Sequence, residues 1–180
     1  MKPWHESMIR MLAGNDYGKL LDTQENTLAF LRHGSERTRR AAISACVHYW
    51  KCHTSHEFLR VCRGLAEADP YDSVRAYAID AIGRAFDSSR DPEISRFLAD
   101  ICEAGGTPAV IREASYWALR RVQLGRSPEE MVKCFASASR GGGNEAAGLF
   151  SKSIDSPVDW DSADKIDQRF VGRFATRAPM

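Results

Sequence analysis

The stretch Ala68–Phe86, ADPYDSVRAYAIDAIGRAF, decides the fold. Asp69-Pro70 predicts the end of one helix and the start of the next, because proline lacks an amide donor but suits the first helical turn. Beyond it, apolar residues recur at i, i+4, i+7, i+8 and i+11, which is one face of an α-helix. These residues are Val74, Ala78, Ala81, Ile82 and Ala85. Most of the face is alanine, so we expect this helix to pack very close to its neighbours.

The same pattern occurs three times at a spacing of 36 to 37 residues. Each copy has a β-branched residue followed by Arg, and then an alanine followed by a larger apolar residue. The copies begin at Thr38-Arg39, Val74-Arg75 and Ile111-Arg112 and continue at Ala45-Cys46, Ala81-Ile82 and Ala118-Leu119. An amphipathic segment precedes each copy, at 25–32, 55–68 and 91–103. The pattern predicts helix pairs that must stack to bury their apolar faces; the alternative is a non-repetitive helical bundle.

This pattern resembles HEAT repeats, including the short form found in phycobilin-lyase-type proteins. In that family an Asp in the turn between the two helices of a unit lies six residues before an Arg, and the two tie adjacent units together. Asp69 and Arg75 match the spacing, whereas Arg39 and Arg112 have His33 and Gly106 in the Asp position. The resemblance covers roughly residues 20–124. It implies a scaffold for binding and says little about what is bound.

We therefore expect an all-α, right-handed α-α superhelix of the HEAT or armadillo type, with three to four helical-pair repeats and terminal caps. Residues 1–180 are predicted to form a single domain. Helices are expected at 4–12, 20–32, 36–50, 55–68, from Asp69-Pro70 to about 87, and at 91–103, 109–124 and 127–138. The domain divides into an N-terminal cap (1–18), three repeats (19–124) and a partial repeat with a C-terminal capping tail (125–180). The alternative for the tail is a segment that becomes ordered only on a partner.

Composition argues against several functional classes. Lys and Arg total 25 against 24 Asp and Glu, a net charge of +1, so bulk charge does not favour nucleic acid or anionic membranes. No run of 18 apolar residues occurs, and the N-terminus has no signal-peptide pattern. We expect a soluble, cytoplasmic protein. The five cysteines are scattered and lack CxxC spacing, so we expect reduced thiols.

Catalytic and metal-binding motifs are absent from the sequence. It contains no GxSxG, HExxH or DxD pattern, and Gly141-Gly142-Gly143 lacks the Lys of a phosphate loop. We therefore expect no enzymatic activity and no cofactor. The residues His48, Cys52, His53 and His56 are the one cluster of metal-ligand types, but they span a predicted helix end. Histidines at a helix end by chance explain the cluster better than a metal site does.

The second helices of the three units carry the predicted binding surface. In HEAT-like stacks these helices line a concave wall, and the residues opposite their core faces would form it. We predict that the wall binds another protein, because Trp and Arg most often anchor protein interfaces. The predicted contact residues are Arg40, Ser44, Asp80, Asp87, Glu113, Trp117 and Arg120. The alternative is a solvated helical face on which the C-terminal tail covers Trp117.

Two other functions stay open at this point. Arginines at 37, 39, 40, 84, 120 and 121 raise the possibility of a HEAT-like DNA-binding protein of the alkylation-repeat type. The near-zero net charge, the acidic residues Asp80, Asp87 and Glu113 on the same wall, and the small number of units argue against it. The resemblance also allows a phycobilin-lyase-like role in chromophore handling, although the sequence shows no obvious pocket for that ligand.

Overall fold

The computed structural model describes residues 2–125, 171, 173 and 174. Within these residues the regular structure is entirely helical, which confirms the predicted all-α class. The chain divides into two compact units, Met1–Ala85 and Phe86–Met180. In the described ranges, no helix is long and apolar enough to span a bilayer.

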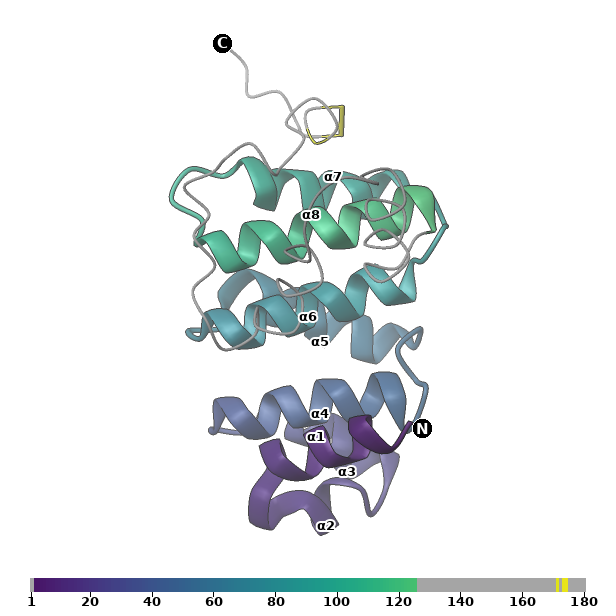
Figure 1. Cartoon of the computed structure of the whole chain (residues 1–180), viewed down its shortest axis with the longest axis vertical. Helices are drawn as coiled ribbons and strands as arrows, with labels where there is room; N and C mark the ends of the chain where they lie inside the picture. The colour runs from purple at the N-terminus through teal and green to yellow at the C-terminus, as the bar shows by residue number, and fades with distance from the viewer. Residues whose placement is uncertain (1, 126–170, 172, 175–180) are drawn as a thin grey trace, which may run out of the picture. The chain divides into compact units, whose positions relative to one another are not determined.

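The first unit is built from helices that pack against one another in pairs. In chain order its elements are α1 (Pro3–Ala13), η1 (Gly14–Asp16), α2 (Tyr17–Leu20), α3 (Gln24–Phe30), α4 (Glu36–His48), α5 (His56–Ala68) and α6 (Asp72–Ala85). Helix α3 packs against α4, α5 packs against α6, and α4 packs against α6 (Figure 1). Two of the predicted helix pairs, α3 with α4 and α5 with α6, are therefore packed together.

Capping residues explain where these helices begin. Ser55 is the predicted N-cap of α5, and its side chain accepts a hydrogen bond from the Phe58 amide at 3.3 Å. The single helix predicted over 20–32 is wrong, because α2 ends at Leu20 and α3 begins at Gln24. Thr23 causes the second start, since its side chain accepts from the Asn26 amide at 3.0 Å.

In the turn between α5 and α6, Asp69 pairs with a different arginine from the predicted one. Asp69 is paired with Arg39, at 2.8 Å from Nε to Oδ2, and both side chains are buried. The predicted Asp69–Arg75 tie is wrong: Arg75 Nε donates to the Ala66 carbonyl at 3.1 Å, and its Nη1 lies 3.7 Å from Asp72. Asp69 also accepts from the Tyr71 amide at 3.0 Å, so α6 begins at Asp72 rather than at Pro70. The aspartate does join successive helix pairs, but through the arginine of the preceding copy.

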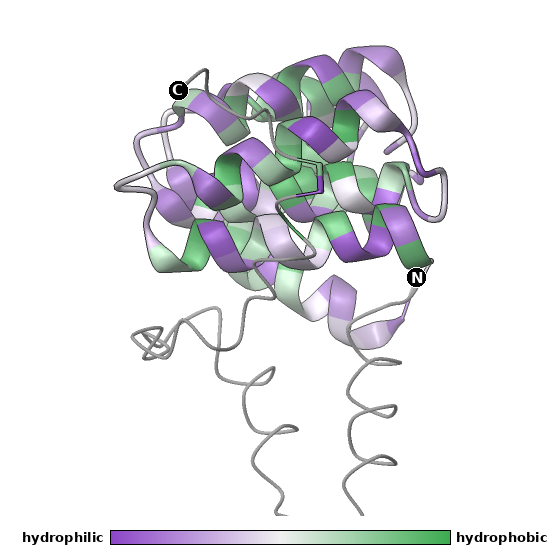
Figure 2. Ribbon diagram, turned by 90° about the horizontal axis from the view of Figure 1, so that it is seen from above, coloured by the Kyte–Doolittle hydropathy of each residue, from purple (hydrophilic) through white to green (hydrophobic). Residues whose placement is uncertain are grey.

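Alanine fills the helix contacts of the first unit, as the pattern predicts. Ala42 and Ala45 of α4 and Ala78 and Ala81 of α6 are all at most 1 % exposed. Small side chains let two helices approach closely, which suits the contact between α4 and α6. Hydrophobic and hydrophilic residues alternate along the helices (Figure 2).

In the second unit, α7 (Pro92–Glu103) packs against α8 (Ala109–Leu124). The predicted Asp-Pro start is confirmed, because the Asp91 side chain accepts from the Ile94 amide at 2.9 Å. Helix α8 has the predicted bounds and ends at Gly125, whose φ of 63° is a left-handed cap. The helix predicted at 127–138 and nearly all of the capping tail lie outside the described residues.

Candidate functional site: faces of α4, α6 and α8

The seven predicted contact residues divide between the two units. Arg40 and Ser44 lie on α4 and Asp80 lies on α6, all in the first unit. Asp87, Glu113, Trp117 and Arg120 belong to the second. The two sets are therefore two candidate sites, each with its own geometry.

The prediction that Arg40 and Ser44 of α4 lie on the surface is wrong. Arg40 is 8 % exposed and Ser44 is 3 % exposed, so neither side chain can meet a partner as a surface residue. The Arg40 guanidinium lies over the Tyr77 ring of α6 at 4.7 Å, and its Nη1 is 3.8 Å from Glu36. The prediction failed because it projected α4 alone and did not anticipate what packs around it.

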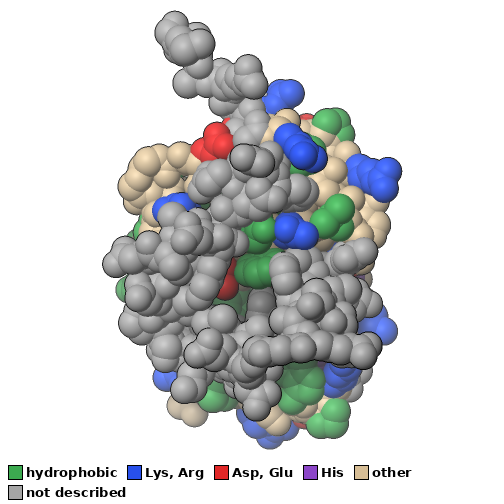
Figure 3. Space-filling model, turned by 45° about the horizontal axis from the view of Figure 1, so that its top comes forward, with side chains coloured by type: hydrophobic (Ala, Val, Ile, Leu, Met, Phe, Trp, Pro, Cys, Tyr) green, Lys and Arg blue, Asp and Glu red, His purple; other side chains and the backbone are tan. Residues whose placement is uncertain are grey.

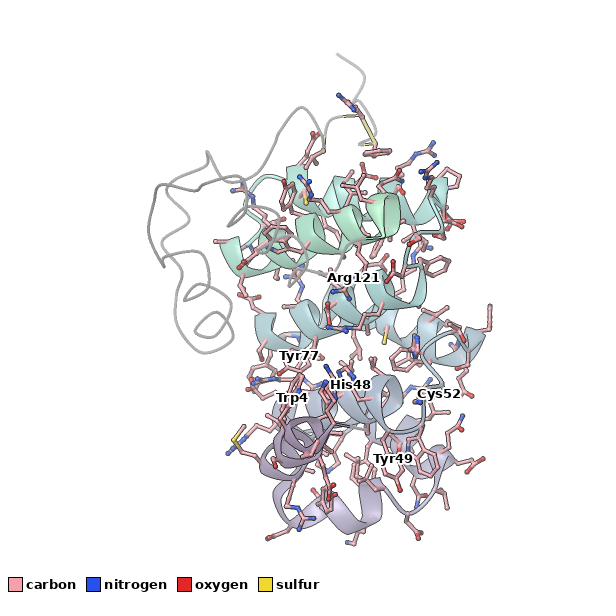
Figure 4. The ribbon with its side chains drawn as sticks, turned by 45° about the vertical axis from the view of Figure 1, so that its right-hand side comes forward. Trp4, His48, Tyr49, Cys52, Tyr77 and Arg121 are labelled. Carbon is pink, nitrogen blue, oxygen red and sulfur yellow. The ribbon has the colours of Figure 1, made fainter. Side chains whose placement is uncertain are left out.

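Helix α1 packs against α4, where the sequence predicted a cap at the end of a stack. Ile9 and Leu12 of α1 are buried, and the Tyr77 hydroxyl reaches the Met8 sulfur at 3.8 Å. Figure 4 shows Trp4 and Tyr77 on the side of the unit where His48 lies. The N-terminal helix is thus an integral part of the first unit.

His48 is stacked on His5 of α1. Their ring centroids are 3.7 Å apart with planes only 11° from parallel, and the Trp4 ring lies 6.4 Å from His48. Burial, followed by the neighbouring His5 and Arg84, lowers the pKa of His48 to about 4, although Asp80 opposes the shift. The ring is therefore neutral near pH 7.

The suspected cluster of metal ligands around this helix end is not assembled. Cys52 donates to the Cys46 carbonyl at 3.7 Å, and burial and Arg84 lower the pKa of His53. Among the residues that the structure describes, no three His, Cys, Asp or Glu side chains are grouped as a metal would require.

Asp80 and Asp87 have local partners. Asp80 accepts from Arg84 Nε at 2.7 Å one turn along α6, and both side chains are partly exposed. Asp87 accepts from the Ser88 hydroxyl at 2.9 Å. Because α6 ends at Ala85, Asp87 lies in the connection to α7 and not on a helix face as predicted.

The face of α8 brings together the remaining predicted residues. Trp117 is half-buried, and its Nε1 donates to Glu113 Oε1 at 3.3 Å. One turn further on, Arg120 Nη1 donates to the Tyr116 hydroxyl at 2.8 Å, and its guanidinium lies 5.6 Å from that ring. The Tyr116 and Trp117 rings meet edge to face at 5.1 Å. Sequence reasoning missed Tyr116, which is 5 % exposed and orients both neighbours.

The arginines that raised the possibility of DNA binding are mostly engaged within the protein. Arg39, Arg40 and Arg121 are each at most 8 % exposed, and Arg84 pairs with Asp80. On the described surface visible in Figure 3, basic side chains occur as separate groups with hydrophobic and acidic side chains among them. A groove that follows a phosphate backbone requires a continuous row of accessible cations.

Comparison of the chain with protein-family models, with curated proteins and with solved structures finds no match.

Proposed function

We propose that this protein is a non-catalytic module of HEAT-like helical pairs that binds another protein through the face of α8. The contact residues would be Glu113, Trp117 and Arg120, oriented by Tyr116. The proposal is narrower than a wall along all the second helices, because Arg40 and Ser44 on α4 are buried.

The arrangement of Trp117 and Arg120 is the observation that carries this proposal. Tryptophan and arginine are the residue types that most often dominate binding energy. Here each is held in place before any partner arrives, by Glu113 at 3.3 Å and by Tyr116 at 2.8 Å respectively. Side chains that are already ordered lose less entropy on binding, so more of their interaction energy contributes to affinity.

The chemistry of this face indicates what the partner presents. Trp117 offers a large apolar surface with a polar edge, which suits an aliphatic or aromatic side chain. Arg120 carries a guanidinium group, for which a carboxylate is the best acceptor. We therefore infer a partner segment with an apolar residue and an acidic residue about one helical turn apart.

The ion pair between Arg39 and Asp69 supports the repeat character of the module. It joins residues 30 positions apart, nearly one repeat, and links the helix pair containing α4 to the turn before α6. A mixed-charge face favours specificity and orientation more than raw affinity.

Affinity capture with matched variants tests the proposal. Wild type would be compared with Trp117→Ala/Arg120→Glu and with Trp4→Ala/Arg10→Glu, which makes the same changes on exposed positions of α1. We expect a protein that the wild type and the α1 variant retain but the α8 variant loses, and at least tenfold weaker binding of that purified protein by the α8 variant. Circular dichroism would first establish that all three are folded. Equal affinity of the wild type and the α8 variant would refute the α8 face, and recovery of nucleic acid or a pigment would favour one of the alternatives.

A further inference from the structure

Two cysteines meet at the end of α4 and the start of the loop that leads to α5. Cys46 lies in the last turns of α4, and Cys52 follows after the helix end (Figure 4). Lys51 has a φ of 55°, a left-handed conformation, immediately before Cys52. The Cys52 amide then donates to the Cys46 carbonyl at 3.0 Å, and the Cys52 thiol lies 3.7 Å from the same oxygen. The loop therefore folds Cys52 back onto Cys46.

The backbone separation suits a disulfide. The Cys52 amide nitrogen lies 3.0 Å from the Cys46 carbonyl oxygen. Standard bond lengths place each Cα atom within about 2.5 Å of its own nitrogen or oxygen, so the two Cα atoms are at most about 7 Å apart. A disulfide spans about 4.4–6.8 Å between Cα atoms. Cys46 and Cys52 can therefore be joined with little movement of the backbone.

The two thiols differ in a way that separates their roles. Cys46 is fully buried, whereas Cys52 is partly exposed and can meet a small oxidant. The interaction between the two thiols lowers the pKa of Cys52, and the same interaction together with burial raises the pKa of Cys46. Cys52 is thus the thiol that ionises more readily and reacts first. Cys46 is the thiol that reacts with Cys52 afterwards.

We propose that Cys46 and Cys52 form an oxidisable dithiol that hydroperoxides convert into an intrachain disulfide. The Cys52 thiolate attacks the terminal peroxide oxygen, the O–O bond breaks, and the alcohol, or water from hydrogen peroxide, leaves. Cys52 becomes a sulfenic acid. The Cys46 sulfur then attacks the Cys52 sulfur and expels water, so that two thiols lose two electrons and two protons. A dithiol reductant reverses the step by thiol–disulfide exchange.

A third thiol provides an internal control. Cys62 of α5 is buried, and burial raises its pKa. Its thiol raises the pKa of Cys46, and Cys52 in turn raises the pKa of Cys62. The mechanism nevertheless assigns the disulfide to Cys46, because the backbone hydrogen bond and the thiol contact join Cys52 to Cys46.

Peptide mass spectrometry tests the pairing on the full chain. Wild-type protein would be treated with hydrogen peroxide, alkylated and digested with trypsin. Cleavage after Lys51 places the two cysteines on separate peptides, 41–51 and 52–60, while Cys62 lies on peptide 61–63. We expect the first two peptides to be recovered as one disulfide-linked species lacking two hydrogen atoms. The thiols titrated after denaturation should fall by two from the five in the chain, and dithiothreitol should restore them.

Two variants sharpen the result. In Cys46→Ser the oxidation should stop at a sulfenic acid on Cys52 that dimedone traps, whereas Cys62→Ser should still form the link. Linkage of peptide 52–60 to any other cysteine peptide in wild type would overturn the proposal. So would a wild-type protein in which Cys52 stays reduced, or stays a sulfenic acid, while peroxide oxidises other cysteines. The wild-type mapping decides the question even if a variant does not fold.

Discussion

Arg39 and Asp69 form a two-point ion pair across 30 residues of sequence, with Nε to Oδ2 and Nη2 to Oδ1 both at 2.8 Å. The Arg39 Nη1 group also donates to the carbonyls of His33 and Gly34, at 2.7 and 3.1 Å. The Tyr71 ring lies 5.6 Å from the guanidinium. The pair thus fixes the turn before α4 and the turn before α6 relative to each other.

Removing one member of this pair should destabilise the first unit strongly. Asp69→Ala leaves the buried Arg39 charge without its carboxylate, which typically costs about 3–5 kcal/mol. Asp72→Ala removes only a partly exposed carboxylate 3.7 Å from Arg75 and should cost under about 1 kcal/mol. Urea denaturation of both variants measures the difference. Equal losses would mean that the Arg39–Asp69 pair contributes little to stability.

Gly125 provides a second test, in the other unit. Its φ of 63° disfavours a side chain, and an added Cβ would clash with the Ser88 hydroxyl oxygen. Gly125→Ala should therefore cost about 1–2 kcal/mol from the backbone alone, with the clash in addition. Gly64→Ala is the matched control, because Gly64 lies within α5 and a Cβ there meets nothing within 4 Å. Gly64→Ala should increase the free energy of unfolding by about 0.5–1 kcal/mol. The melting temperature should therefore rise.

If Gly125→Ala melts like the wild type, the left-handed cap does not hold the end of α8 in solution. If Gly64→Ala is destabilising instead, then the open space beside α5 is filled in the folded protein.

Core alanines should be sensitive to enlargement. Ala81 is 1 % exposed on α6, so Ala81→Leu adds methyl groups where no space is left and should cost about 1–3 kcal/mol. Ala76→Leu makes the same change at a half-exposed position of the same helix and should cost less. Thermal melts of the two variants compare them directly. An unchanged melting curve for Ala81→Leu would remove Ala81 from the core.

The local signals of the sequence predict the helices well. Asp91-Pro92 and Ser55 indicated helix starts because a capping side chain acts within its own turn, and both act as caps in the structure. The bounds of α8 follow from the turn residues on either side of it. The buried alanine face of α6 follows from helical periodicity, which also depends only on near neighbours.

The sequence could not predict which distant residues meet. The resemblance to HEAT repeats suggested Arg75 as the partner of Asp69. A match in spacing contains no information on which copy of the arginine turns toward that carboxylate. The placement of α1 against α4 was missed for a similar reason. The apolar residues of α1 indicate an amphipathic helix, but they do not identify the helix against which α1 packs. The burial of Arg40 and Ser44 was not predicted either, and it leaves α8 as the candidate binding face.

The His48–His5 stack should make the stability of the first unit depend on pH. The pKa of His48 is about 4 in the folded protein and near its ordinary value of 6.5 when unfolded. The unfolded state therefore binds the proton more readily, so stability is fully present above about pH 6.5 and is lost as the pH falls toward 4. Because the side chain is only about half buried, we expect a loss of roughly 1–2 kcal/mol from this residue. His53 should add a loss of the same sign, since its pKa is lowered as well.

His48→Phe separates this titration from the other groups that face the ring, which include His5, Asp80 and Arg84. Phenylalanine keeps an aromatic ring that can pack against His5 but cannot take up a proton. Urea midpoints at pH 7 and pH 5 should fall clearly in wild type and less in the variant. Identical pH dependence in the two proteins would show that His48 is protonated equally easily in the folded and unfolded states. In that case neither the burial of His48 nor the stacked ring of His5 would lower the pKa of His48.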